Sequence, residues 1–164
     1  MSGYATAGWE NFFVAEASAA AALAGLLFVA ISINLPKILA YRQLPGRAGE
    51  ALIILLGVLV SASLGLVPGQ SRVALGAEIL IVGLCVWIYP MVLQARVGRL
   101  SGAPRRWVVT RMLIHQIATV PMVTTGISLL AGIGGGLYWL ALAVVLSFGA
   151  AIAHAWVLLV EIQR

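Results

Sequence analysis

Five apolar runs, each about 20 residues or longer, constrain this chain more than any other feature of its sequence. An α-helix rises 1.5 Å per residue, so about 20 apolar residues cross the roughly 30 Å of hydrocarbon in a bilayer. The runs cover about residues 12–34, 48–67, 73–94, 107–131 and 137–160. We therefore predict an all-α integral membrane protein, a compact bundle of five transmembrane helices.

The composition supports a membrane class and excludes an ordinary soluble domain. Hydrophobic residues make up 62% of the chain and charged residues 9%, against about 45–50% and 25% in soluble domains. A soluble protein of 17.2 kDa cannot bury this much apolar surface in one core. We expect a single transmembrane domain over residues 1–164, with the lipid bilayer as its first partner.

Basic residues concentrate in two of the predicted loops. The opposite side has only Arg72, and the residues before the first run contain no Lys or Arg. By the positive-inside rule the two basic loops are cytoplasmic, which places the N-terminus outside and the C-terminus in the cytoplasm. We expect a multi-pass protein of the cytoplasmic (inner) membrane. Because the formal charge of +5 lies mostly in loops, it indicates topology, and we expect no nucleic-acid binding. The basic residues are Lys37, Arg42 and Arg47 in the first loop (35–47), and Arg96, Arg99, Arg105 and Arg106 in the third.

The run at 48–67 is the shortest, and its Gly and Ser content leaves a re-entrant element open as an alternative. The polar break Pro68–Arg72 favours two full spans on either side of it. The last four runs form two hairpins of the same sense, so a duplicated hairpin is a further possible interpretation.

Glu16 and Glu78 are carboxylates inside predicted spans, where an ionisable group costs about 2.5–3.5 kcal/mol on insertion scales. Each lies six or seven residues past an interfacial residue, so both are expected about 10 Å below the outer surface. They are candidates for an ion or proton pathway. The alternative is that each is capped locally or pairs with Arg72.

His115 and His154 form a second pair, for which hydrogen-bonded histidines at a helix interface are one interpretation and an ion or proton pathway is the functional hypothesis. Counted from Gly134 at the last turn, they lie 19 and 20 residues away, so facing helices place them at similar depth. Helices joined by so tight a turn pack about 8–10 Å apart, which leaves little room for a haem. The chain has no Asp and no Cys–His cluster, so we predict no metal and no cofactor, with haem b as an alternative.

Trp107, Arg111 and His115 follow each other at four-residue spacing and therefore share one helix face. Arg111 is close enough to the inner boundary to contact lipid headgroups, and it could instead meet Glu50 or Glu161 from neighbouring spans. Gating or lipid contact is the predicted role of Trp107 and Arg111.

Pro121 gives the fourth run a further candidate for gating, because a proline inside a helix frees a carbonyl and permits a kink. The same run carries polar side chains that could line a narrow water path or bind helices together. They are Gln116, Thr119, Thr124, Thr125 and Ser128.

We predict no catalytic residues, because no serine elbow, P-loop or dinucleotide-binding pattern is present. Five short spans enclose little space, so the leading hypothesis is a homo-oligomeric channel or transporter for a small ion or solute. The first alternative is an accessory or assembly subunit of a larger membrane complex, which would use the small-residue face of Ala17, Ala21 and Gly25. The second is a haem or redox protein built on His115 and His154.

Overall fold

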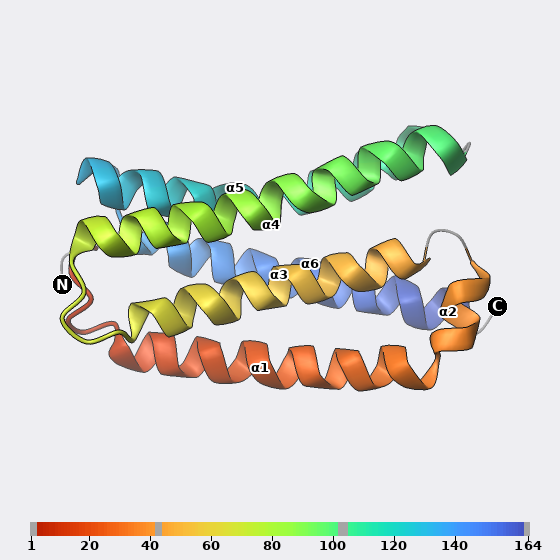
Figure 1. Cartoon of the computed structure of the whole chain (residues 1–164), viewed down its shortest axis with the longest axis horizontal. Coiled ribbons are helices and arrows are strands. Elements are labelled where there is room, and N and C mark those ends of the chain that lie inside the picture. The colour runs from red at the N-terminus through yellow and green to blue at the C-terminus, as the bar shows by residue number, and fades with distance from the viewer. Residues whose placement is uncertain (1–2, 42–43, 102–104, 163–164) are drawn as a thin grey trace.

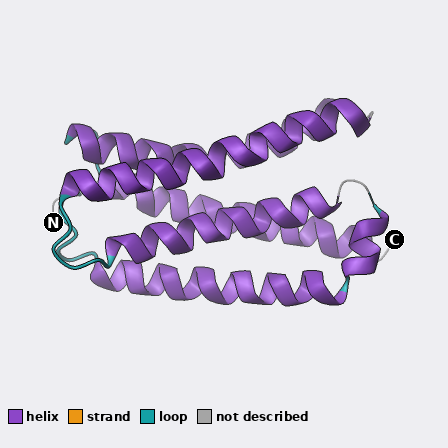
Figure 2. Cartoon of the chain, viewed as in Figure 1, coloured by secondary structure: helices purple, strands orange, loops and turns teal. Residues whose placement is uncertain are grey.

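The computed structural model describes residues 3–41, 44–101 and 105–162, and within these ranges every regular element is a helix. Five helices are long and apolar enough to cross a membrane (Figure 1). Figure 2 shows that short loops join them. The prediction of an all-helical protein with five candidate spans is confirmed, and it indicates a multi-pass membrane protein. The long helices are α1 (Glu10–Ile33), α3 (Leu44–Gly65), α4 (Arg72–Ser101), α5 (Arg105–Ala131) and α6 (Leu137–Ile162).

The first predicted loop contains a short helix that the sequence analysis missed. We expected an irregular connection from residue 35, and α2 (Leu35–Ala40) forms there instead. Pro36 lies in its first turn, where the missing proline N–H is not needed for a helical hydrogen bond. The doubtful run at 48–67 is an uninterrupted helix of 22 residues, about 33 Å long, so the structure gives no support to a re-entrant element.

Four of the long helices form a closed ring. Helix α3 packs against α4, α4 against α5, α5 against α6, and α6 against α3. Helices α3 and α5 are therefore diagonal to each other, and α1 packs on the outside of the ring, mainly against α3. The N-terminal tail and the α3–α4 and α5–α6 turns lie at one end, here called the turn end, and α2 and the C-terminus lie at the other, here called the C-terminal end (Figure 1).

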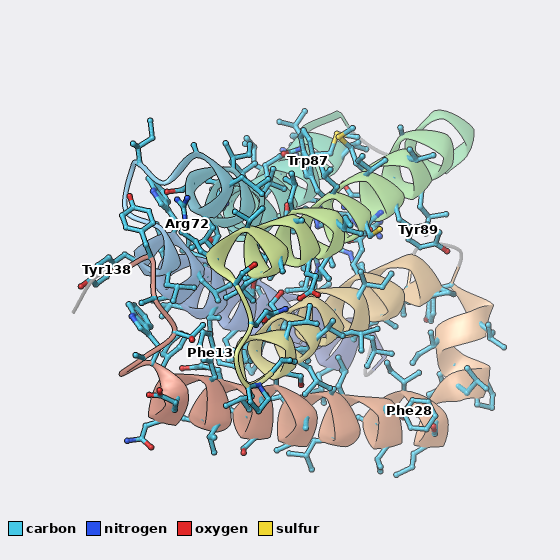
Figure 3. The ribbon with its side chains drawn as sticks, turned by 60° about the vertical axis from the view of Figure 1, so that its left-hand side comes forward. Phe13, Phe28, Arg72, Trp87, Tyr89 and Tyr138 are labelled. Atoms are coloured by element: carbon cyan, nitrogen blue, oxygen red, sulfur yellow. The ribbon has the colours of Figure 1, made fainter. Side chains whose placement is uncertain are left out.

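The core is apolar and lies toward the turn end. Phe13 of α1 is fully buried and points into the bundle (Figure 3), against Gly65 of α3. A smaller cluster continues the core toward the C-terminal end with Ile54, Val86 and Ala118. The main cluster draws on all five long helices and includes Val58, Leu75, Ile79, Met122, Leu129, Leu137 and Leu140.

Glycine allows the backbones of α4 and α5 to approach each other closely. A Cβ atom added at Gly126 of α5 would lie 2.7 Å from the Cα and backbone N of Leu80 on α4. Gly83 of α4 meets the backbone of α5 in a similar way, at 3.1 Å from the backbone N of Val123. Small residues at such crossings let membrane helices gain van der Waals contact along their backbones.

We predict that Gly126→Ala destabilises the bundle by about 1–3 kcal/mol, because its methyl group overlaps a backbone that cannot move aside. Gly149→Ala on α6 is the matched control, since a Cβ there meets nothing within 4 Å. Thermal unfolding of both variants in detergent measures the difference. Equal stability of the two variants would contradict the close α4–α5 contact.

Candidate functional site

An ion pair crosses the ring from α5 to α3. The Nε atom of Arg111 lies 2.8 Å from Oε2 of Glu50, and its Nη2 atom lies 2.5 Å from Oε1. Glu50 is 1% exposed and the Arg111 side chain 11%. The guanidinium lies over Gly46, one turn before Glu50, where a Cβ atom would be 2.9 Å from Nη2. Because α3 and α5 are diagonal, this bidentate pair lies between the four helices of the ring.

His154 of α6 faces the same carboxylate. Its Nε2 atom is 3.9 Å from Oε2 of Glu50, which is too long for a hydrogen bond, and it has no other partner in the described part of the chain. The side chain of His154 is 2% exposed. Other groups within electrostatic range of His154 are Arg47, Arg111 and His115. A small movement would bring His154 into direct contact with Glu50.

His115 of α5 binds the backbone of α4. Its Nε2 atom lies 3.1 Å from the carbonyl oxygen of Trp87, and a carbonyl only accepts, so Nε2 carries the hydrogen in this contact. Its Nδ1 atom is buried and has no partner among the described residues. Pro90 lies inside α4 and lacks the N–H that would bind the Val86 carbonyl, which loosens the turn that His115 contacts. The proline inside α4 was the sequence signal for this loosened turn.

Gln94 of α4 is a polar residue that the sequence analysis missed. It is 3% exposed, and neither atom of its amide has a hydrogen-bond partner in the described residues. Val86 of α4 packs against Gly57 of α3, so these two residues lie at the same depth. Gln94 lies eight residues after Val86 on α4, and Glu50 lies seven residues before Gly57 on α3. In antiparallel helices this register places Gln94 and Glu50 at about the same depth.

These five residues, Glu50, Gln94, Arg111, His115 and His154, are called the polar cluster below. They come from the four helices of the ring and lie in the half of the bundle nearer the C-terminal end.

A line of polar side chains continues from the polar cluster along the buried face of α5 to the turn end. Three hydroxyl residues follow Arg111 and His115 along α5, and all three are buried. The first keeps the four-residue spacing, whereas the second lies six residues further on, beyond the buried Met122. Thr119 donates to the His115 carbonyl at 2.7 Å, and Thr125 donates to the Pro121 carbonyl at 2.8 Å. Ser128 donates to the Ile133 carbonyl and accepts from the Gly136 N–H. Arg111, His115, Thr119, Thr125 and Ser128 are called the α5 stripe.

The two predicted outer carboxylates do not share a hydrogen bond or an ion pair in the described structure. Glu78 of α4 accepts a hydrogen bond from Gln70, and Glu16 lies half-buried on α1. Helix α1 packs against α3, whereas α4 packs chiefly against α5. The structure thus gives each carboxylate its own surroundings, and an ion pathway through both stays a prediction.

The predicted gating residues have different surroundings. Arg111 meets Glu50, one of the two acidic partners that we expected, while the side chain of Glu161 lies outside the described residues. Trp107 lies in α5, but its side chain is also outside the described part. Pro121 is buried inside α5, and the helix continues through it.

The histidine pair fits the haem alternative poorly. The Nε2 atom of His115 is occupied by the Trp87 carbonyl, and α5 and α6 pack directly against each other, so no gap for a macrocycle separates the two rings. Within the described ranges no group of three or more His, Cys, Asp or Glu residues is placed to hold a metal ion.

No protein-family profile matches the sequence, no curated protein matches it, and no solved structure matches the fold. The interpretation of the polar cluster therefore rests on its own geometry and on the cost of burying its charges.

We predict strong coupling between Glu50 and Arg111. Glu50→Leu or Arg111→Met alone leaves one buried charge uncompensated and should cost about 3–5 kcal/mol of stability, whereas the double variant should lose far less than the sum. A double-mutant cycle by unfolding in detergent measures this coupling. Lys37→Met, which removes an exposed charge on α2, should change stability by no more than about 0.5 kcal/mol. Additive losses would contradict the pair.

Proposed function

We propose that this protein is a small membrane transporter that moves protons through the interior of its own bundle. The observation that carries the proposal is the polar cluster inside the ring, continued by the α5 stripe. Ionisable residues within membrane helices cost about 2.5–3.5 kcal/mol each on insertion scales and commonly mark ion and proton pathways. Here ionisable residues of two helices, α5 and α6, converge on one carboxylate of α3.

The chemistry of the cluster suits a proton relay. Glu50 is paired with Arg111, and His154 lies 3.9 Å from its carboxylate with an Nε2 atom that has no hydrogen-bond partner among the described residues. A proton arriving on His154 can pass to Glu50 after a small approach of the two groups. Protonated Glu50 no longer compensates Arg111, so the guanidinium must rearrange, and that rearrangement couples proton binding to movement of α5 against α3.

The described conformation is a closed state in this proposal. The α5 hydroxyls donate to backbone carbonyls and are not free to hold a water chain, and the main core cluster separates the polar cluster from the turn end. Helices α3 and α4 leave an apolar groove of about 830 Å³ between them, lined by residues that include Gly57, Val60, Val86 and Tyr89. Movement of the α4–α5 pair relative to α3 at this groove would open the proton route through the bundle.

The proposal includes orientation, location and assembly. The turn end faces outward and the C-terminal end faces the cytoplasm, because basic residues such as Lys37 and Arg106 flank the C-terminal end; the membrane is the cytoplasmic one. Ala21 and Gly25 are exposed on α1 and suit close approach of a second copy, so each chain of a homo-oligomer would hold its own route. An accessory subunit would use the same face, and it would show no transport alone.

We predict that the purified chain, reconstituted in liposomes with a trapped pH-sensitive dye, conducts protons when a potassium gradient and valinomycin impose a potential. The double variant Glu50→Leu/Arg111→Met should stay folded and lose at least about tenfold of the flux, since it removes the relay carboxylate. Lys37→Gln, which removes an exposed charge outside the polar cluster, should conduct normally. Wild-type flux no greater than that of empty liposomes, or full flux in the folded Glu50/Arg111 double variant, would refute the proposal.

A further inference from the structure

A second polar site lies at the turn end of the bundle. A cavity of about 260 Å³ is lined there by the N-terminal tail, the α3–α4 turn and the ends of α4, α5 and α6. Its floor includes Leu75 and Leu129, which belong to the main core cluster, so the cavity lies directly on the core. Its polar lining residues include Tyr4, Gln70 and Arg72.

Arg72 gives the cavity a positive charge. It is the first residue of α4, and its guanidinium lies against Gly132 in the α5–α6 turn, which fixes the position of the group (Figure 3). Within the described ranges no carboxylate or carbonyl accepts a hydrogen bond from Arg72. A guanidinium carries five donors in a planar fork that suits a carboxylate, and the N-terminal end of α4 adds a partial positive charge.

Tyr4 and Gln70 add one donor and one acceptor. The Tyr4 hydroxyl accepts a hydrogen bond from the Gly135 N–H at 2.7 Å, so its own hydrogen points elsewhere, and no described residue accepts it. Gln70 donates through Nε2 to Glu78, which fixes the orientation of its amide. The Oε1 atom of Gln70 is then left buried without a partner. A ligand with both an anionic group and a donor would satisfy all three residues.

We propose that this cavity binds a small carboxylate that also carries a hydrogen-bond donor, such as an α-hydroxy or α-amino acid. The carboxylate lies on Arg72 and Tyr4, and the Gln70 amide turns toward the cavity so that its Oε1 atom accepts from the hydroxyl or ammonium group. Such a ligand has few enough atoms for a cavity of about 260 Å³. Binding at this cavity does not require proton transport. The inference rests on the proposed function only where it treats the cavity as the outer entrance of the proton route.

Isothermal titration calorimetry of the full chain in detergent tests the site with four probes. L-lactate and L-alanine each have the required donor, propionate lacks it, and glycerol 3-phosphate represents a lipid headgroup. We expect lactate or alanine to bind at least about fivefold more tightly than propionate, because only they satisfy Gln70. Arg72→Gln should weaken binding at least about tenfold, and Lys37→Gln, which removes a charge at the other end, should leave it unchanged.

Three outcomes would overturn the inference: no binding of lactate or alanine at millimolar concentration, binding that survives Arg72→Gln, or preference for glycerol 3-phosphate, which would identify a headgroup site. If Arg72→Gln fails to fold, Arg72→Lys and Tyr4→Phe serve instead, and each should weaken lactate or alanine binding in a folded protein. The Glu50→Leu/Arg111→Met variant should keep this binding while losing proton flux. Carboxylate binding without proton flux would support this inference and contradict the proposed transport. Proton flux without carboxylate binding would do the reverse.

Discussion

The buried pair between Glu50 and Arg111 is the interaction on which the rest of the interior depends. It joins two diagonal helices of the ring, and so it fixes where α3 and α5 lie along each other. A charge at this depth is tolerated only when it is paired and hydrogen-bonded. The pair also sets the environment of His154, whose Nε2 atom lies 3.9 Å from the same carboxylate. Removing either charge changes the ring and the histidine together.

Apolar length and loop chemistry made the helices predictable, because crossing a bilayer requires a run of fixed minimum length. The sequence also places His115 and His154 on facing helices, and it names Glu50 as one of two partners for Arg111. Helix α2 was missed because Pro36 reads as a loop residue when its first-turn position is unknown. Helices that are apolar all round carry almost no signal of their buried face, so the closed ring was not predictable.

The least predictable features depend on register between distant segments. In the sequence, Gln94 is an ordinary polar residue near the end of a predicted span. Its buried position at the depth of Glu50 follows only from the packing of Val86 against Gly57. The surroundings of Glu16 and Glu78 depend on which helix α1 packs against, and the order of helices along the chain does not determine this. The cavity beside Arg72 needs the N-terminal tail to fold over three helix ends. Each feature arises from tertiary packing, and no local motif encodes it.

Access of water to the α5 stripe tests the central claim most directly. In a Cys85→Ser background, single cysteines at Thr119, Thr125 and Ser128 are compared with Ile117, Val120 and Ile127, which are exposed on the outer surface of the same helix. Thiol reagents need the thiolate and therefore water. A membrane-impermeant reagent should modify the stripe positions under a proton gradient and leave the three outer-surface positions unmodified. Unreactive stripe positions in a conducting protein would contradict an interior route.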